Sequence, residues 1–125
     1  MIFALVEDPQ FAKLIGDSAD QENEDCLILK TEEELEEALV QETPKVFIID
    51  MGVSLVDAPT LIEKLKLNPA TRTIPIVVYG NSLRADLMQD ARELGVDLAL
   101  PKASFKQQLP EIIRCYQKQQ PKKTL

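Results

Sequence analysis

Histidine is the most informative absence in this sequence, because the 125 residues contain none. Histidine is the usual general base of enzymes and a member of the Ser-His-Asp and Cys-His triads, so those catalytic arrangements are excluded. Cysteine is scarce as well, and Cys26 and Cys115 lie far apart in segments with apolar periodicity. Because no secretory signal accompanies them, we expect two small buried side chains and not a disulfide.

Long apolar runs and excess positive charge are also lacking. No apolar run approaches the roughly 18 residues of a membrane-spanning helix, so we expect no contact with a membrane interior. The first eleven residues have no basic leader before their short apolar run, so we expect no signal peptide and a cytoplasmic protein. A net charge of −7 argues against nonspecific binding to nucleic acids or anionic membranes.

What the chain does contain is a regular alternation of apolar runs and helical patterns. With 45% hydrophobic residues, it predicts a folded domain over residues 1–120, followed by a short tail over 121–125. Short runs rich in β-branched and aromatic residues predict buried strands, over residues 2–6, 26–29, 46–49, 76–79 and 97–100. Strands that alternate with helices indicate a doubly wound α/β fold, a parallel sheet with helices on both faces.

Five segments have the apolar spacing of amphipathic helices, over residues 9–15, 31–39, 59–68, 83–94 and 109–116. Thr31 with Glu34 forms the pattern of a capping box, and Gly95 is suited to end the fourth helix. The polar stretch 16–24 predicts a loop or a frayed helix end. Pro110 lacks a backbone N–H, so we expect it in the first turn of the last helix, or a late start of that helix.

Charged residues follow three of the predicted strands at their carboxyl ends, where open α/β sheets bind ligands. Glu7 and Asp8 follow the first strand, Asp50 ends the third, and Lys102 follows the fifth. In the strand order 2-1-3-4-5 of known doubly wound sheets, strands 1 and 3 are neighbours, so the three carboxylates should lie close together. A hard divalent cation such as Mg²⁺ would relieve their repulsion. Alternatively, Asp50 only caps a loop or the next helix.

Together these features resemble the receiver domain of bacterial two-component response regulators. The resemblance covers residues 2 to about 119. The pieces that carry it are Leu5-Val6-Glu7-Asp8, Val46-Phe47-Ile48-Ile49-Asp50, the spacer to Asp57, Ile74-Pro75-Ile76-Val77-Val78, and Gly95-Val96-Asp97 with the run to Lys102.

The resemblance implies a function and a role for each site residue. Asp50 would accept a phosphoryl group from a histidine kinase or phosphotransfer protein in a phosphorelay, and Lys102 would pair with the phosphoryl oxygens. Asp8 would be the main side-chain ligand of Mg²⁺, with Glu7 acting through water and the Gly52 carbonyl completing the protein ligands. A downstream protein would bind the face of the fourth helix, fifth strand and fifth helix. A homodimer is a second assembly that we consider. We expect a signalling module and not an enzyme.

The positions that usually switch the family depart from its pattern. Strand 4 normally ends in Thr or Ser, but Gly80 stands there, and Ser82 follows two residues later. The aromatic residue of strand 5 is replaced by Ala99, and Pro101 precedes the lysine instead of following it. We therefore expect a phosphate mimic on the phosphoacceptor to leave residues 83–116 nearly unchanged.

Two alternatives remain open beside the phosphorylated receiver. One is a pseudo-receiver, a protein–protein interaction module with the same fold that phosphorylation does not regulate. The other is an unrelated small α/β enzyme. A nucleotide binder would need a Gly/Ser/Thr-rich loop after the first strand, where Glu7-Asp8-Pro9 would repel a phosphate. A phosphatase of the haloacid-dehalogenase type would need an acid where Gly52 stands.

Overall fold

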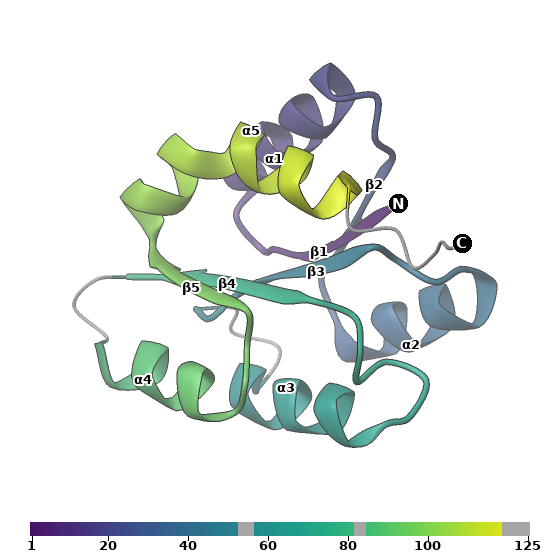
Figure 1. Ribbon diagram of the computed structural model, residues 1–125, viewed down its shortest axis with the longest axis vertical. Coiled ribbons are helices and arrows are strands. Elements are labelled where there is room, and N and C mark those ends of the chain that lie inside the picture. The colour runs from purple at the N-terminus through teal and green to yellow at the C-terminus, as the bar shows by residue number, and fades with distance from the viewer. Residues whose placement is uncertain (53–56, 82–84, 119–125) are drawn as a thin grey trace.

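The computed structural model describes residues 1–52, 57–81 and 85–118, and in them five parallel strands form one sheet of order β2-β1-β3-β4-β5 (Figure 1). The strands are β1 (Ile2–Leu5), β2 (Cys26–Leu29), β3 (Val46–Asp50), β4 (Ile76–Gly80) and β5 (Leu98–Pro101). All four strand pairs are parallel. The predicted doubly wound α/β fold and its strand order are confirmed.

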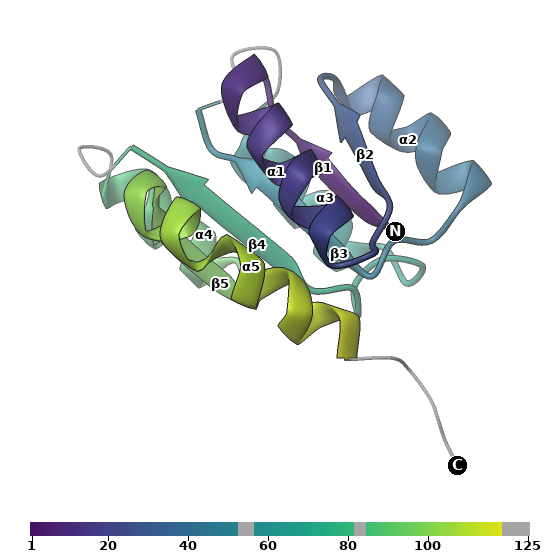
Figure 2. The same cartoon turned by 90° about the horizontal axis from the view of Figure 1, so that it is seen from above.

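Helices connect the strands and cover both faces of the sheet. They are α1 (Pro9–Gln21), α2 (Glu32–Gln41), α3 (Ala58–Leu67), α4 (Ala85–Glu93) and α5 (Lys102–Lys118). Helices α1 and α5 lie on one face, and α2, α3 and α4 lie on the other (Figures 1 and 2). Within the described part of the chain, no helix combines the length and the apolar character needed to cross a membrane.

The side chains of the central strands alternate between two hydrophobic cores, as the period of two along a strand requires. Phe3, Leu5 and Ile49 contribute to the core beneath α2, α3 and α4. Their strand neighbours Ala4 and Ile48 contribute to the core beneath α1 and α5. Both sets are almost completely buried, which explains the continuous apolar runs in the sequence.

Helix α1 is longer than predicted, because the stretch 16–24 was expected to be a loop or a frayed end and is helical as far as Gln21. Ser18 and Ala19 are buried, so the second half of the helix still has a face packed against the fold. The chain leaves the helix at Asn23, which has a positive φ of 57°. The polar composition of this stretch reflects its solvent-facing side.

The prediction for Pro110 was wrong. Helix α5 begins at Lys102, directly after β5, and Pro110 lies in its interior. An interior proline removes one helical hydrogen bond and costs about 3 kcal/mol. Phe105 and Leu109 are both completely buried, and burying each such side chain contributes about 1.5–3 kcal/mol. Tertiary packing of the helix therefore outweighs the local cost of the proline.

The helix boundaries agree with the remaining predictions to within a few residues. The side chain of Thr31 accepts a hydrogen bond from the Glu34 N–H, as the capping pattern predicts, while the Glu34 carboxylate accepts one from the Lys30 N–H. Helix α4 is described from Ala85, so the predicted start near residue 83 lies outside the described residues. Gly95 ends that helix region with φ 94°.

The two cysteines are not equivalent. No disulfide joins them, as expected. Cys26 is partly buried, and burial raises the pKa of its thiol to about 11. Cys115 is exposed, so the prediction that it is buried was wrong. It follows the buried residues Ile112 and Ile113 on α5 but lies on the outer side of that helix.

Candidate functional site

A cavity of about 770 Å³ opens at the carboxyl end of the sheet. Its lining comes from the ends of β1, β3, β4 and β5 and the segments that follow them. The lining residues are Glu7, Asp8, Pro9, Asp50, Gly52, Gly80, Asn81, Pro101, Lys102 and Ala103. All the residues predicted for phosphoryl acceptance and metal binding line this cavity, whereas Ala99 does not.

Asp50 is the last residue of β3 and its side chain is partly buried. Its Oδ1 atom accepts a hydrogen bond of 2.8 Å from the Gly52 N–H, which fixes one carboxylate oxygen. Burial raises the pKa of Asp50, and the negative charge of Asp8 raises it further. The Gly52 N–H and the Lys102 ammonium act in the opposite direction. The carboxylate is therefore held in an environment that penalises its charge.

Asp8 and Lys102 face each other across the cavity. Asp8 is the N-cap of α1, where its Oδ1 accepts a hydrogen bond of 2.9 Å from the Gln10 N–H. Its Oδ2 lies 3.7 Å from the Nζ of Lys102, the first residue of α5. That ammonium also lies 4.7 Å from the centre of the Phe11 ring. Both charged side chains are partly solvent-exposed, so this long ion pair is weak and easily exchanged.

The three carboxylates share the cavity without forming a metal-ready cluster. Among the residues that the structure describes, no three His, Cys, Asp or Glu side chains are placed so that they could hold a metal ion. The predicted set of Asp8, Asp50 and the Gly52 carbonyl contains only two carboxylates, so it stays a prediction. The remaining oxygen donors, two carboxylates and the Gly52 carbonyl, fit a hard cation such as Mg²⁺, which keeps several water ligands.

The surroundings of Gly80 leave little room for a side chain. A Cβ atom at this position would lie 3.2 Å from the Sδ of Met88 and 3.4 Å from the Cβ of Met51. Met88 belongs to α4, so this helix packs against the strand end. A hydroxyl side chain at position 80 would require the Met88 side chain to shift by a few tenths of an ångström.

Ala99 lies in the hydrophobic core beneath α4 and is almost fully buried. Its carbonyl oxygen accepts a hydrogen bond of 3.2 Å from Arg92 of α4. The site expected to carry an aromatic switch residue is thus a closed contact between α4 and β5. The structure does not bring Ala99 into the cavity.

Tyr79 is a site residue that the sequence analysis treated only as part of a buried strand. It is completely buried and pairs in the sheet with Asp50. Its hydroxyl lies close enough to Asp50 for each group to shift the pKa of the other, but does not meet the geometry of a hydrogen bond. Burial, followed by the charge of Asp50, raises the pKa of Tyr79 well above its ordinary value. The sequence signal that could have identified Tyr79 is its position one residue before the carboxyl end of a strand.

Solved structures of response regulators superimpose on almost the whole chain. One from Hahella chejuensis matches with a TM-score of 0.83 and 14% identity, over 98% of both chains. The manganese-bound form of the response regulator Rcp1 matches with a TM-score of 0.80 and 18% identity, also over 98% of both chains. This chain has the receiver fold.

A further receiver-fold structure is that of the phosphorylated cyanobacterial phytochrome response regulator RcpA. It matches with a TM-score of 0.75 and 20% identity, over 94% of this chain and 90% of the other. No protein-family model matches the sequence, and no curated protein matches it either. At these identities the structural likeness establishes the receiver fold, and the chemistry must be argued from the residues in the cavity.

Proposed function

We propose that this chain is a receiver domain of a bacterial two-component system, in which Asp50 accepts a phosphoryl group from a histidine kinase or phosphotransfer protein. The observation that carries the proposal is the cavity at the carboxyl end of the sheet. It combines a strand-terminal carboxylate, Asp50, with a second carboxylate, Asp8, and an ammonium group, Lys102. This is a set of groups that phosphoryl transfer to a carboxylate requires.

The chemistry needs no general base from the protein, because a carboxylate is ionised at neutral pH. The Gly52 N–H holds Oδ1 of Asp50, and we assign the nucleophilic role to Oδ2. This oxygen forms a bond to phosphorus while the bond from phosphorus to the donor's imidazole nitrogen breaks, and that nitrogen keeps the electron pair. The donor ring carries a proton on its other nitrogen, so the products are an acyl phosphate on Asp50 and a neutral imidazole on the donor.

Lys102 would neutralise charge on the phosphoryl oxygens in this reaction, and Asp8 would help to hold the Mg²⁺. The weak ion pair between them allows the Lys102 ammonium to move from Asp8 to the phosphoryl oxygens. Asp8, Asp50 and the Gly52 carbonyl would then hold Mg²⁺, with Glu7 acting through water. A bound Mg²⁺ supplies positive charge that offsets the two carboxylates and the incoming phosphoryl group.

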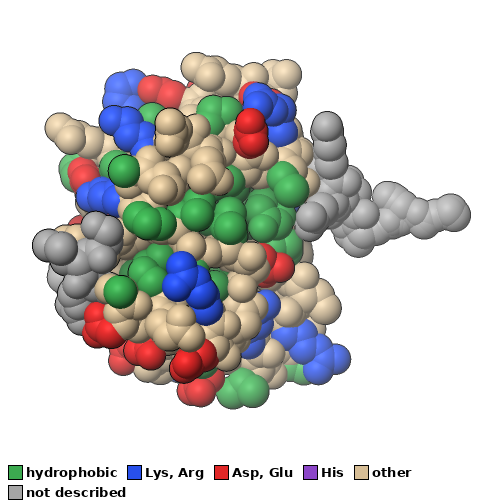
Figure 3. Space-filling view, turned by 60° about the vertical axis from the view of Figure 1, so that its left-hand side comes forward, with side chains coloured by type: hydrophobic (Ala, Val, Ile, Leu, Met, Phe, Trp, Pro, Cys, Tyr) green, Lys and Arg blue, Asp and Glu red, His purple; other side chains and the backbone are tan. Residues whose placement is uncertain are grey.

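We propose that the partner-binding surface is the edge of the sheet at β5. Figure 3 turns this edge forward and shows a band of hydrophobic side chains between α5 above and α4 below. Leu98 and Leu100 of β5 are only partly buried. We propose that a downstream protein, or a second copy of the chain, binds this face in the bacterial cytoplasm.

The test is phosphorylation of the purified protein with acetyl phosphate and Mg²⁺, followed by intact-mass measurement. We expect the mass of one added phosphoryl group in the wild type and none in Asp50→Asn. Asp17→Asn is the control, because Asp17 is an exposed residue whose carboxylate pairs with Lys13 on the surface of α1. A wild type that remains unmodified, or an Asp50→Asn variant that is still modified, would contradict the proposal.

The second candidate is a pseudo-receiver that binds partners through the same face without phosphorylation. The observation in its favour is the packing of Met88 and Met51 beside Gly80, where a switching hydroxyl would otherwise stand. The same experiment separates the two functions. Absence of the phosphoryl adduct, with the fold intact, favours the interaction module.

A further inference from the structure

We propose that the Tyr79 hydroxyl donates a hydrogen bond to an oxygen of the phosphorylated Asp50 side chain, and that the Tyr79 ring relays this contact to α1 and α5. The proposal deepens the function proposed above and rests on it. Tyr79 would thereby provide the donor that Gly80 and Ala99 cannot provide.

The first observation is the state of the hydroxyl itself. Tyr79 is completely buried, and its hydroxyl oxygen has no hydrogen-bond partner in the structure. In the described parts of the chain, no other buried side-chain nitrogen or oxygen lacks one. A buried hydroxyl without a partner is unfavourable, so it calls for a functional explanation. A donor that is left unpaired in the free protein can be satisfied when a ligand brings a new acceptor.

The second observation is the direction from which the acceptor would come. Asp50 and Tyr79 are paired neighbours on β3 and β4, and Gly80, the next residue, lines the cavity. The hydroxyl approaches the Asp50 carboxylate closely enough for each group to shift the pKa of the other, but stays outside the distance and angle of a hydrogen bond; Asp8 acts on it less strongly. Phosphorylation of Asp50 adds several strong acceptor oxygens at this place. The bond to Tyr79 would therefore form in the occupied site and be absent from the free one.

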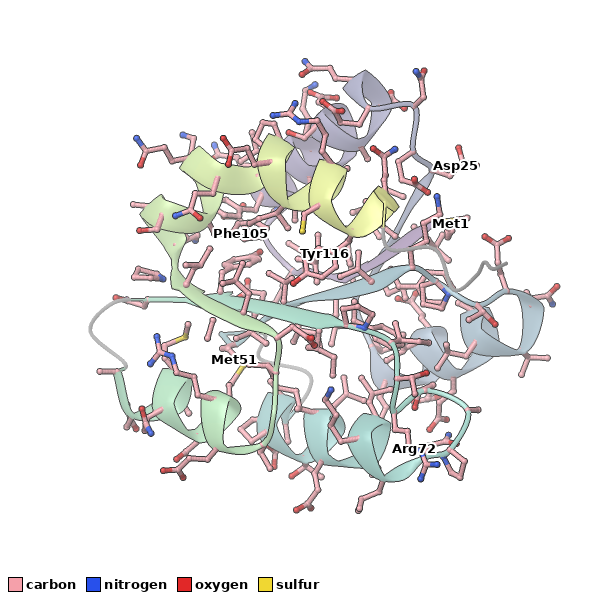
Figure 4. All side chains as sticks on the ribbon, viewed as in Figure 1. Met1, Asp25, Met51, Arg72, Phe105 and Tyr116 are labelled. Carbon is pink, nitrogen blue, oxygen red and sulfur yellow. The ribbon has the colours of Figure 1, made fainter. Side chains whose placement is uncertain are left out.

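The third observation is the contact that the ring makes with two helices. The Tyr79 ring stacks on Phe105 of α5, with centroids 4.4 Å apart and an interplanar angle of 20°. It also contacts Phe11 of α1, with a centroid distance of 5.0 Å. Figure 4 shows Phe105 directed from α5 toward the sheet. Because this core is closely packed, a shift of the tyrosine ring must be followed by these two rings.

This route differs from the one through α4. Phe105 and Phe11 belong to the core beneath α1 and α5, whereas Met88 and Gly80 meet on the opposite side. We expected a phosphate mimic to leave residues 83–116 nearly unchanged, and we now limit that expectation to α4. Changes are expected in the first part of α5.

The test compares Tyr79→Phe with Tyr116→Phe, using beryllofluoride and Mg²⁺ as the probe. Both variants remove one hydroxyl from a buried tyrosine of the core between α5 and the sheet, but Tyr116 lies near the far end of α5 from the cavity. We expect wild type and Tyr116→Phe to bind the probe equally in a calorimetric titration, and Tyr79→Phe to bind it about tenfold more weakly. Without the probe, Tyr79→Phe should be at least as heat-stable as the wild type, because the hydroxyl it loses is unpaired.

A spectroscopic readout distinguishes a hydrogen bond from a general effect on packing. The chain has two tyrosines and no tryptophan, so Tyr79 is the only tyrosine in the Tyr116→Phe variant. Adding the probe to this variant should change its tyrosine absorption and fluorescence. The change should disappear when Asp50→Asn is introduced into the same variant.

Each outcome decides a separate question. Probe binding that needs Asp50 but is equally strong in Tyr79→Phe overturns the role of Tyr79 and leaves the phosphoacceptor intact. Equal losses in Tyr79→Phe and Tyr116→Phe overturn it too, because they indicate a packing effect. A wild type that neither binds the probe nor accepts a phosphoryl group overturns both proposals.

Discussion

At the scale of single residues, the free protein holds Asp50 in an unfavourable state. Burial raises the pKa of its carboxyl, and the nearby charge of Asp8 adds to this effect. The N–H of Gly52 and the ammonium of Lys102 offset only part of the penalty, since the pKa remains raised. A bound cation would relieve this penalty, which supports the proposed metal and phosphoryl binding at Asp50.

The charge penalty predicts that Asp50→Asn increases the free energy of unfolding at pH 7 in the absence of divalent cations. A raised pKa means that the native state binds this proton more tightly than the unfolded state does. The wild type should therefore regain stability relative to the variant as the pH falls from the folded pKa towards the unfolded value near 3.8. Thermal unfolding of both proteins over this pH range measures the difference.

Asp17→Asn is again the matched control, since it also removes one negative charge. A lower or unchanged melting temperature for Asp50→Asn at pH 7, or a difference that grows as the pH falls, would contradict the prediction. Adding Mg²⁺ should reverse the order, because the cation binds the wild-type carboxylate and stabilises the native state by mass action.

At the scale of elements, helix α5 contributes to the site although its sequence contains a residue that disfavours a helix. Its first residue, Lys102, faces the cavity, and Phe105 packs against Tyr79. Pro110 lies in the middle of the same helix and removes one of its hydrogen bonds. The first half of α5 is therefore tied to the site by packing. The continuity of the helix at the proline depends on buried side chains on both sides of it, Leu109 before it and Ile112 after it.

We predict that Pro110→Ala stabilises the protein by about 1–2 kcal/mol. Alanine restores the backbone N–H and has a much better helix propensity, although the unfolded chain also gains about 0.4–1 kcal/mol of conformational freedom. Urea unfolding measures the change. Glu111→Ala is the neighbouring control at an exposed position of α5 and should be nearly neutral. A destabilised Pro110→Ala variant would show that the proline is required by the packing of the helix.

At the scale of the whole molecule, the two faces of the sheet differ in how they connect to the cavity. On the face of α1 and α5, aromatic rings from both helices contact Tyr79. On the other face, Met88 of α4 packs beside Gly80, which has no side chain to move. Phosphorylation of Asp50 should therefore change the structure around α1 and α5 and leave α4 almost unchanged.

Chemical-shift mapping with beryllofluoride and Mg²⁺ tests this asymmetry. We expect large amide shifts around Asp8, Asp50 and Lys102, moderate ones near Phe11 and Phe105, and small ones along α4. In Tyr79→Phe the shifts near Phe105 should shrink while those around Asp50 persist. Shifts along α4 as large as those around Asp50 would contradict the prediction and point to coupling through the backbone of Gly80.

The sequence alone was sufficient for the architecture and for most of the cavity. Short apolar runs rich in β-branched residues favour strands buried on both faces, and such strands require helices above and below them. Once the strands are parallel, their carboxyl ends meet at one edge. For this reason the sequence predicts that Asp8, Asp50 and Lys102 lie at one site, and all three line the cavity.

Tertiary packing decided the features that local patterns could not. The burial of Phe105 and Leu109 kept α5 helical through Pro110, and the burial of Ser18 and Ala19 extended α1 beyond its apolar stripe. Propensity and periodicity describe neighbours along the chain, whereas these outcomes depend on contacts between distant segments.

The same reason applies to the site. The closeness of Met88 to Gly80 comes from contacts between distant segments. The stacking of Tyr79 on Phe105, and the position of its hydroxyl near Asp50, come from them as well. The sequence determined which charged groups meet in the cavity, because the ends of parallel strands must meet. Only the three-dimensional packing decided which neutral side chains surround them, and so which hydroxyl is available to respond.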